Sequence, residues 1–404
     1  MGAAPELQVV APDPKVHLPE MYEMCAKVFS KPERHATFLE WCRNAYIGNS
    51  HYDWNTATIG ILDGRIVTHY GIWGYVMRIG SARIRKTGVG LVATHPDYRK
   101  RGLMTLTANR SMELMRENGY DMSTVTGIAH YYDRFGYVPA WNVTDYSVEA
   151  HHLPDEKPGV RIRTFEPGHH ADLAKLYNRR NARRTCTVMR PTFLKNQRPG
   201  QWFGYRWNDT DGKLAGYVIV SKEKSTLRAL DWAGNDADTF AVLCSLVRKH
   251  GSEILAFKGM HYDDPLRTRV IGQFCATATT RYRSTGGPMI TTINLASTLT
   301  KLAGEFSRRL KDSSAADWQG SLVIADANEK ATLLIDRSKV EVGPPARTKH
   351  SISGGNHIAR LLIGSDEPGE VVKDAGMRLM GDARRLVEVL FPNNHPTQGQ
   401  WDHV

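Results

Sequence analysis

A short basic run followed by a glycine is the part of the sequence best suited to bind an anion. The run is Arg99, Lys100 and Arg101, and Gly102 follows it directly. Guanidinium groups donate charge-assisted hydrogen bonds to phosphate oxygens. Glycine has no side chain to keep a ligand away from the backbone. The pattern therefore favours binding of a phosphate or diphosphate group.

Three tyrosines lie near a glycine turn further along the chain. Tyr131 and Tyr132 precede Phe135-Gly136, and Tyr137 follows it. Such tyrosines can fill a core while each hydroxyl finds one hydrogen-bond partner, or they can line a site.

The residues around the basic run predict a strand, a loop and a helix that would position it. Residues 91–94 are β-rich, and Pro96 follows them. One face of the predicted helix carries Met104, Ala108, Met112 and Met115, and Gly119 is suited to end it. The first amides of a helix have no intrahelical partner and, with the helix dipole, attract an anion. The alternative is a basic loop that caps an ordinary helix.

The strand, Pro96, Tyr98-Arg99-x-Arg101-Gly102-Leu103 and the helix together resemble the cofactor motif of the GNAT superfamily of N-acetyltransferases. The string Tyr132-Asp-Arg-Phe-Gly-Tyr137-x-Pro139 is similar to that of one subgroup, the enhanced intracellular survival (Eis) acetyltransferases. One position departs from the family pattern. The family often has Gly or Ala where this chain has Met104, so close approach of the cofactor must be arranged differently there.

The resemblance implies acetyl-CoA as co-substrate, no metal, and a defined set of site residues. The implied cofactor-binding residues are Val92, Ala93, Thr94, Arg99, Lys100, Arg101, Gly102, Leu103, Met104 and Thr126. Tyr132 would protonate the departing thiolate. In Eis-type enzymes the C-terminal carboxylate is the base, which corresponds here to Val404. Because the family usually ends in an aromatic residue, Asp402 and His403 are alternatives, as is a tail without a role.

The length of 404 residues predicts two or three domains. The resemblance implies an N-terminal GNAT domain over residues 1–150 and a second, degenerate GNAT-like domain over 151–288. A sterol-carrier-protein-like α/β domain would follow over 289–404. The expected fold class is α+β (α/β), in which each GNAT fold is a mixed sheet flanked by helices.

Local patterns predict individual elements within these domains. Asp63-Gly64 and Gly80-Ser81 predict two hairpin turns. Apolar periodicity predicts helices over 239–250, 294–310 and 371–379. A hairpin is expected from residues 320–325 and 330–335.

Composition excludes several other classes of protein. No apolar run approaches the ~18 residues that a membrane span needs, and residues 1–14 lack the pattern of a secretory signal. A cytoplasmic protein without a membrane partner is therefore expected. The five cysteines are odd in number and never form C-x-x-C, which argues against a disulfide framework and a zinc site. The net charge of +11 is scattered, and without a recognition motif it does not favour a nucleic-acid partner.

The motifs and the resemblance together predict acetyl transfer from acetyl-CoA to a primary amine by direct attack. The expected acceptors are an aminoglycoside, a lysine side chain or another small amine, and the resemblance implies a homo-oligomer that is commonly hexameric. His95, at the strand end, is a second candidate base, although we expect it to shape the loop. The alternative function is a non-catalytic sensor of acetyl-CoA or a binder of an apolar ligand.

Overall fold

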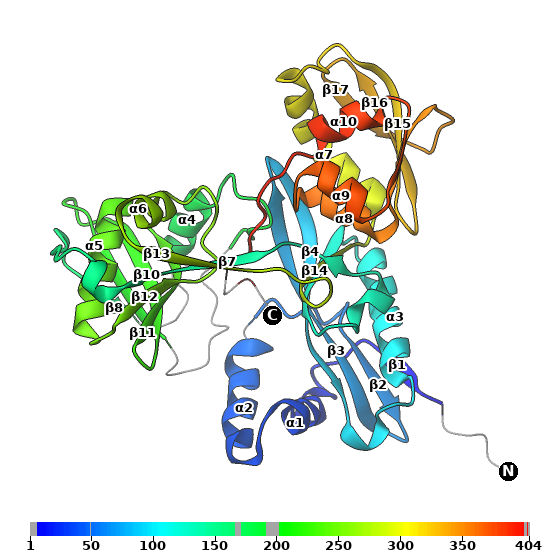
Figure 1. The fold of residues 1–404 in the computed structure, drawn as a ribbon. Helices are drawn as coiled ribbons and strands as arrows, with labels where there is room; N and C mark the ends of the chain where they lie inside the picture. The colour runs from blue at the N-terminus through cyan, green and yellow to red at the C-terminus, as the bar shows by residue number, and fades with distance from the viewer. Residues whose placement is uncertain (1–5, 49, 166–170, 191–201, 400–401, 403–404) are drawn as a thin grey trace. The chain divides into compact units, whose positions relative to one another are not determined.

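The computed structural model describes residues 6–402 except for 49, 166–170, 191–201 and 400–401. The chain forms two compact units (Figure 1). The described residues of the first unit lie in 6–141 and 284–394, and those of the second lie in 142–283 and 395–402. Mixed sheets with flanking helices confirm the predicted fold class.

A seven-stranded sheet forms the centre of the first part of unit one, in the order β1-β2-β3-β4-β5-β14-β6. Its strands are β1 (Gln8–Val10), β2 (Thr58–Leu62), β3 (Arg65–Ile79), β4 (Ala82–Thr94), β5 (Met122–Gly127), β6 (Val138–Pro139) and β14 (Gly287–Thr292). The two predicted hairpin turns are confirmed, since β2 pairs with β3 and β3 pairs with β4, both antiparallel. Within the described part of this sheet, β4 and β5 are the one pair of parallel neighbours.

Helices cover both faces of this sheet. The helices α1 (Leu18–Phe29) and α2 (His35–Trp41) lie on one side, and α3 (Leu103–Glu117) lies on the other (Figure 1). On the α3 side, Thr68 of β3 shares a hydrogen bond with Thr107 of α3 at 2.7 Å. The predicted helix after Gly102 is thus confirmed, and Gly119 follows its end with φ +71°.

The sheet of the second unit has the order β13-β7-β12-β11-β10-β9-β8. Its strands are β7 (Val143–Glu149), β8 (Arg163–Phe165), β9 (Phe203–Asn208), β10 (Leu214–Glu223), β11 (Thr226–Ala233), β12 (Ile254–Phe257) and β13 (Ala276–Arg281). Its helices are α4 (Ala171–Arg180), α5 (Asp236–Lys249) and α6 (Pro265–Gln273). The core of this unit includes Trp207, Phe240 and Phe257.

The two seven-stranded sheets repeat one arrangement, including a parallel pair joined through a helix: β4-α3-β5 in the first and β11-α5-β12 in the second. Each sheet also takes a strand from the other's stretch of sequence. Strand β14 lies between β5 and β6, and β7 lies between β12 and β13. The repeated order agrees with two related folds in tandem.

A third sheet, in the order β17-β16-β15-β18-β19, belongs to the first unit. It contains β15 (Gln319–Ala325), β16 (Lys330–Asp336), β17 (Lys339–Gly343), β18 (His350–Ser353) and β19 (Arg378–Met380). The helices are α7 (Leu295–Lys311), α8 (Ile358–Ile363), α9 (Pro368–Asp374) and α10 (Ala383–Leu390). The carboxylate of Glu305 in α7 accepts hydrogen bonds from the Ser81 N–H and hydroxyl, which attaches this part to the β3–β4 turn.

One helix prediction in this part is wrong. The segment 371–379 is helical only to Asp374, and Gly376 adopts φ +59°. The next residues, Arg378–Met380, pair with β18, so sheet pairing overrides the apolar periodicity there. Among the described residues, no helix has the length and apolar character needed to cross a bilayer.

Candidate functional site

The parallel pairing of strands β4 and β5 ends about halfway along β4. Their parallel pairing runs from Lys86↔Met122 to Val89↔Val125 and stops there. Beyond that point β4 continues with β3 as its partner, and β5 continues with β14. The facing main-chain edges of residues 90–94 and 126–127 are therefore left for an extended ligand, which can bind as an added strand would.

A β-bulge marks the point where β4 turns away. The β3–β4 register shifts between His69 and Gly71, and Leu91 adopts φ +44°. The predicted residues 92–94 follow the bulge. Ala93 is fully buried, whereas Val92 and Thr94 are half-buried, so the site can use the main chain of all three but not the Ala93 side chain. Thr126 is exposed at the end of β5.

The loop from β4 to α3 presents a helix start that no side chain caps. Gly102 is the N-cap residue of α3. No side chain among the described residues accepts a hydrogen bond from the first amides of this helix, and its first turn has no acidic residue. Gly102 has φ +75° and Lys100 has φ +62°. A Cβ at Gly102 would meet nothing within 4 Å, so the backbone conformation is what favours glycine here. The hypothesis of close ligand approach at Gly102 stays a prediction.

The predicted basic residues lie at the surface of this loop. Arg99, Lys100 and Arg101 are exposed, Leu103 is half-buried, and Met104 is buried. Nε of Arg99 donates weakly to the Thr94 carbonyl at 3.4 Å, and Arg101 donates to the Asp97 carbonyl at 3.2 Å. Met104 can therefore offer a ligand its amide but not its side chain.

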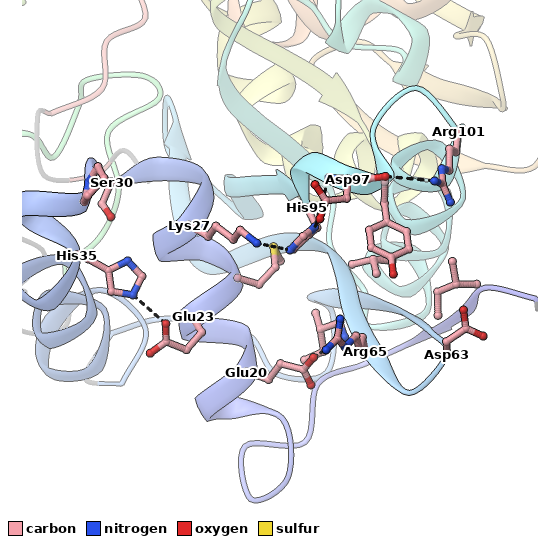
Figure 2. A pocket seen from close by; sticks show the side chains of 16 residues that line it. Glu20, Glu23, Lys27, Ser30, His35, Asp63, Arg65, His95, Asp97 and Arg101 are labelled. Atoms are coloured by element: carbon pink, nitrogen blue, oxygen red, sulfur yellow. Dashed lines mark hydrogen bonds and ion pairs between the residues drawn. The ribbon is translucent and has the colours of Figure 1, made fainter.

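A pocket adjoins the loop on the α1 side (Figure 2). Its charged lining includes Lys27, Arg65 and Arg101 together with Glu20, Glu23 and Asp97. Glu20 accepts from the Ile66 amide at 2.9 Å, and Glu23 lies 2.8 Å from His35. Asp63 also lines the pocket, so four carboxylates face three cations and the pocket as a whole is not basic.

His95 takes part in shaping this pocket. Nζ of Lys27 lies 2.9 Å from His95 Nε2, where it donates, and Nδ1 faces the Asp97 carboxylate at 3.6 Å. Burial and the nearby Lys27 lower the pKa of His95. A neutral imidazole held in this way fits the expected role in shaping the loop.

A comparison with known proteins assigns this region to a family. Residues 14–140 match the model of the acetyltransferase (GNAT) domain. The chain carries a GNAT acetyltransferase domain. The match makes the protein an acyltransferase, and it covers the separated strands, the loop and Tyr132. A search among curated proteins by sequence finds no match.

Solved structures resemble the chain over nearly its whole length. A GCN5-related N-acetyltransferase from Anabaena variabilis ATCC 29413 has a TM-score of 0.77 at 13% identity, covering 99% of this chain and 100% of that one. A counterpart from Kribbella flavida has 0.75 at 16%, covering 99% of each. Eis1 from Mycobacterium abscessus has 0.70 at 14%, covering 99% and 100%. At these identities the likeness concerns the fold, and it agrees with the expected Eis-like architecture.

Tyr132 of the GNAT domain lies at the end of β5, in a short 3-10 helix (Tyr132–Phe135). Its ring is buried against Gly127, where a Cβ would come within 2.7 Å of it. Among the described residues its hydroxyl has no hydrogen-bond partner, whereas Tyr137 shares one with Ser123 at 2.6 Å. Burial, with Tyr137 and Tyr131 nearby, raises the pKa of Tyr132. The hydroxyl therefore keeps its proton and is available to donate it.

The C-terminal candidates separate into one described residue and two that are not. Val404 and His403 lie outside the described residues. Asp402 is fully buried in the second unit, where it accepts from Arg190 Nε at 2.8 Å and from the Tyr177 hydroxyl at 2.5 Å. This carboxylate anchors the tail, so the alternative of Asp402 as base is not supported. The Arg190 partner was missed because 212 residues separate the two.

The sequence interpretation also missed His69, a fully buried histidine on β3 beside the bulge. The expectation that no metal is needed stays a prediction. In the second unit Glu149, His151 and His152 hold potential ligand atoms within 4.8 Å of one another, but all three are exposed. They are not among the residues of the GNAT domain described above.

Proposed function

We propose that the protein transfers the acetyl group of acetyl-CoA to a primary amine by direct attack. The observation that carries the proposal is the gap where β4 and β5 part beside the uncapped start of α3, with Tyr132 at the end of β5. A slot of main-chain groups, an anion site and an unpartnered hydroxyl thus lie along neighbouring elements. These are the parts that thioester binding and thiolate release need.

The described residues fit acetyl-CoA as the co-substrate. Main-chain groups of residues 92–94 would hold the pantetheine arm. The amides of Gly102, Leu103 and Met104, with the charges of Arg99, Lys100 and Arg101, would hold the diphosphate.

Each bond change in the transfer has an assigned group or an open candidate. The neutral amine forms the new C–N bond as the C–S bond breaks, and Tyr132 donates its proton to sulfur. The amine loses a proton to a base, for which the α-carboxylate of Val404 is our first candidate and His403 the second. The acceptor is an aminoglycoside, a lysine side chain or another small amine. A homo-oligomer, hexameric in line with the family, and a cytoplasmic location remain predictions.

Calorimetry with acetyl-CoA and a thiol-release assay test this function. The panel of acceptors is kanamycin, a lysine-containing peptide and spermidine. We expect acetyl-CoA to bind and at least one amine to release thiol. Binding without turnover on any amine would favour the sensor, and no binding would overturn both functions.

Tyr132→Phe, compared with Tyr137→Phe, tests the proton donor. We expect Tyr132→Phe to bind acetyl-CoA as the wild type does and to lose about 100-fold in kcat, within the usual range for a general acid. Tyr137→Phe is the matched control, because it makes the same change at a neighbouring buried tyrosine. It loses the hydrogen bond to Ser123, so it should lower the free energy of unfolding by about 1 kcal/mol and leave kcat nearly unchanged. Equal kcat values in the wild type and Tyr132→Phe would remove Tyr132 from the mechanism.

A further inference from the structure

A buried histidine of β3 forms a hydrogen bond with the main chain of the bulge in β4. Nδ1 of His69 lies 2.7 Å from the carbonyl oxygen of Leu91. Because a carbonyl only accepts, Nδ1 carries the proton and Nε2 must be an acceptor. The hydroxyl of Tyr52 lies 2.7 Å from Nε2 and donates to it. One tautomer of His69 therefore satisfies both bonds.

The surroundings leave this imidazole little freedom. His69 and Tyr52 are 0% and 6% exposed, and the Tyr52 ring packs edge-on against Trp73 with 5.0 Å between centroids. Gly71 makes the space: a Cβ there would lie 2.8 Å from His69 Cε1 and 2.7 Å from the Gly90 carbonyl oxygen. Cys25 contacts Nδ1 through sulfur at 3.6 Å. The arrangement is a shaped cavity for the ring, with a fixed direction for each nitrogen.

The bond to Leu91 also fixes the next amide. A trans peptide is planar, so the carbonyl of Leu91 and the N–H of Val92 point in opposite directions. With the carbonyl turned to His69 on β3, the Val92 N–H points away from β3. That is the edge of β4 that β5 has left. The φ of +44° at Leu91 is unfavourable for a residue with a branched side chain, so the conformation needs support from its surroundings.

We propose that His69, held by Tyr52, is a positioning residue that aims the Val92 N–H into the gap between β4 and β5. There the amide donates to the thioester carbonyl oxygen of acetyl-CoA. The inference rests on the proposed function, since it names His69 as the residue that holds the bulge in register with acetyl-CoA. His69 itself touches no reacting atom.

Two substitutions distinguish the role of the Nδ1 donor of His69 from that of its Nε2 acceptor. His69→Asn places an amide nitrogen near the position of Nδ1 and can still donate to Leu91. His69→Gln places an amide oxygen near the position of Nε2, so it can still accept from Tyr52 but loses the donor to Leu91. Both remove the ring, so a purely structural role predicts similar losses in the two variants.

We expect the two variants to differ in turnover and in a vibrational signal. In His69→Gln, kcat should fall about 10- to 100-fold, because a misaimed oxyanion donor costs on this scale. The Kd for acetyl-CoA should rise no more than about threefold, since most contacts lie elsewhere. His69→Asn should recover most of kcat. With ¹³C-carbonyl acetyl-CoA bound, the infrared carbonyl band should shift to low frequency in the wild type and His69→Asn, and less in His69→Gln.

Controls decide between this inference and the function on which it rests. Cys25→Ala alters the same cavity without touching either strong bond, and should keep kcat and the carbonyl band. If either His69 variant does not fold, Tyr52→Phe decides, with kcat expected to fall about threefold to tenfold. If the wild-type protein neither binds acetyl-CoA nor releases thiol, both the proposed function and this inference are overturned. An active wild type with the same kcat and band in His69→Gln, or in Tyr52→Phe where that variant decides, overturns the inference alone.

Discussion

The two seven-stranded sheets use the same order of elements but opposite chemistry at the start of the helix after the parallel strand. In the first, a loop of residues 95–101 leads to Gly102, the N-cap residue of α3, and no described side chain caps this helix. In the second, Gly234 and Asn235 alone connect β11 to α5, and the Asn235 side chain accepts from the amides of Ala237 and Asp238 at 2.9 and 3.3 Å.

Charge and packing reinforce the difference. The first turn of α5 contains Asp236 and Asp238, whereas that of α3 has no acid. Strand β12 pairs with β11 along its whole length, up to Ala229↔Phe257, and Trp232 packs against Phe257 with 5.9 Å between ring centroids. In the second sheet, a side chain thus caps the helix start that the first sheet leaves open. The candidate site of the first sheet therefore depends on the absence of a side-chain cap and of acidic residues at the described start of α3.

The buried polar groups of the two sheets also differ. The first holds a neutral imidazole, His69, between two hydrogen bonds. The second holds a guanidinium, Arg190, between Asp231 at 2.6 Å and Asp402 at 2.8 Å, over the Tyr177 ring. A neutral group aims the backbone, whereas the ion pairs fasten the tail to the domain.

The largest expected effect is on the ion pairs of the second sheet. Arg190→Met leaves two buried carboxylates without their cation and should lower the free energy of unfolding by about 3–5 kcal/mol. Urea unfolding measures this. The matched control is Arg110→Met, which removes an exposed cation from Glu113 and Glu117 and should change stability by less than about 1 kcal/mol. Equal losses in both would show that the buried pairs do not stabilise the fold.

The second effect concerns acid and the first sheet. Burial lowers the pKa of His69 from 6.5 to about 4, so the folded state favours the neutral ring. The unfolded chain therefore binds the extra proton between these pH values, and the stabilisation present above pH 6.5 is lost as the pH falls toward 4. The loss should approach about 3 kcal/mol. The His69→Asn variant should lack this component when unfolding is measured across pH 4–7, and identical profiles would contradict it.

The third prediction concerns a substitution that places a negative charge at the start of α3, where α5 has its acidic residues. Gly102→Asp puts a carboxylate beside the amides proposed for the diphosphate, and should weaken acetyl-CoA binding at least about 100-fold. Gly102→Asn, its neutral isostere, tolerates positive φ and should weaken binding only about tenfold. Calorimetry measures both. If the two variants bind alike, charge at this helix start does not govern affinity.

The smallest effect is on the cap of the second sheet. Asn235→Ala removes the side chain that satisfies two amides of α5 and should lower stability by about 1 kcal/mol. Acetyl-CoA affinity should stay unchanged, because the site lies in the other domain. Thermal unfolding and calorimetry on one preparation give both numbers, and a change in affinity would argue that the second helix start takes part in binding.

The local features of the site could be predicted from sequence because they depend on neighbours in the chain. The basic run, Gly102 and the helix after it are contiguous, and Tyr132 belongs to one short string. The conformational reason for Gly102 could not, since a φ value depends on how the loop is closed. Likewise, the apolar period over 371–379 gave no sign that Arg378 would pair with β18.

The rest depends on contacts between distant residues. Between Thr68 and Tyr70, His69 is indistinguishable in sequence from a core residue of a strand. Its role arises from Leu91 and Tyr52, which lie 22 and 17 residues away. The exchange of β7 and β14 was missed for the same reason, because most strands pair with a neighbour in sequence and no local pattern marks an exception.

The position of β14 sets a limit on how the molecule can be made and divided. Until residues 287–292 have been synthesised, the β5 edge of the first sheet has no partner there, and an open edge invites pairing with other chains. A fragment that ends near residue 150 would also carry β7 without its own sheet. The sheet of the GNAT domain thus closes only after the strands of the second sheet have been synthesised, although its sequence comes first.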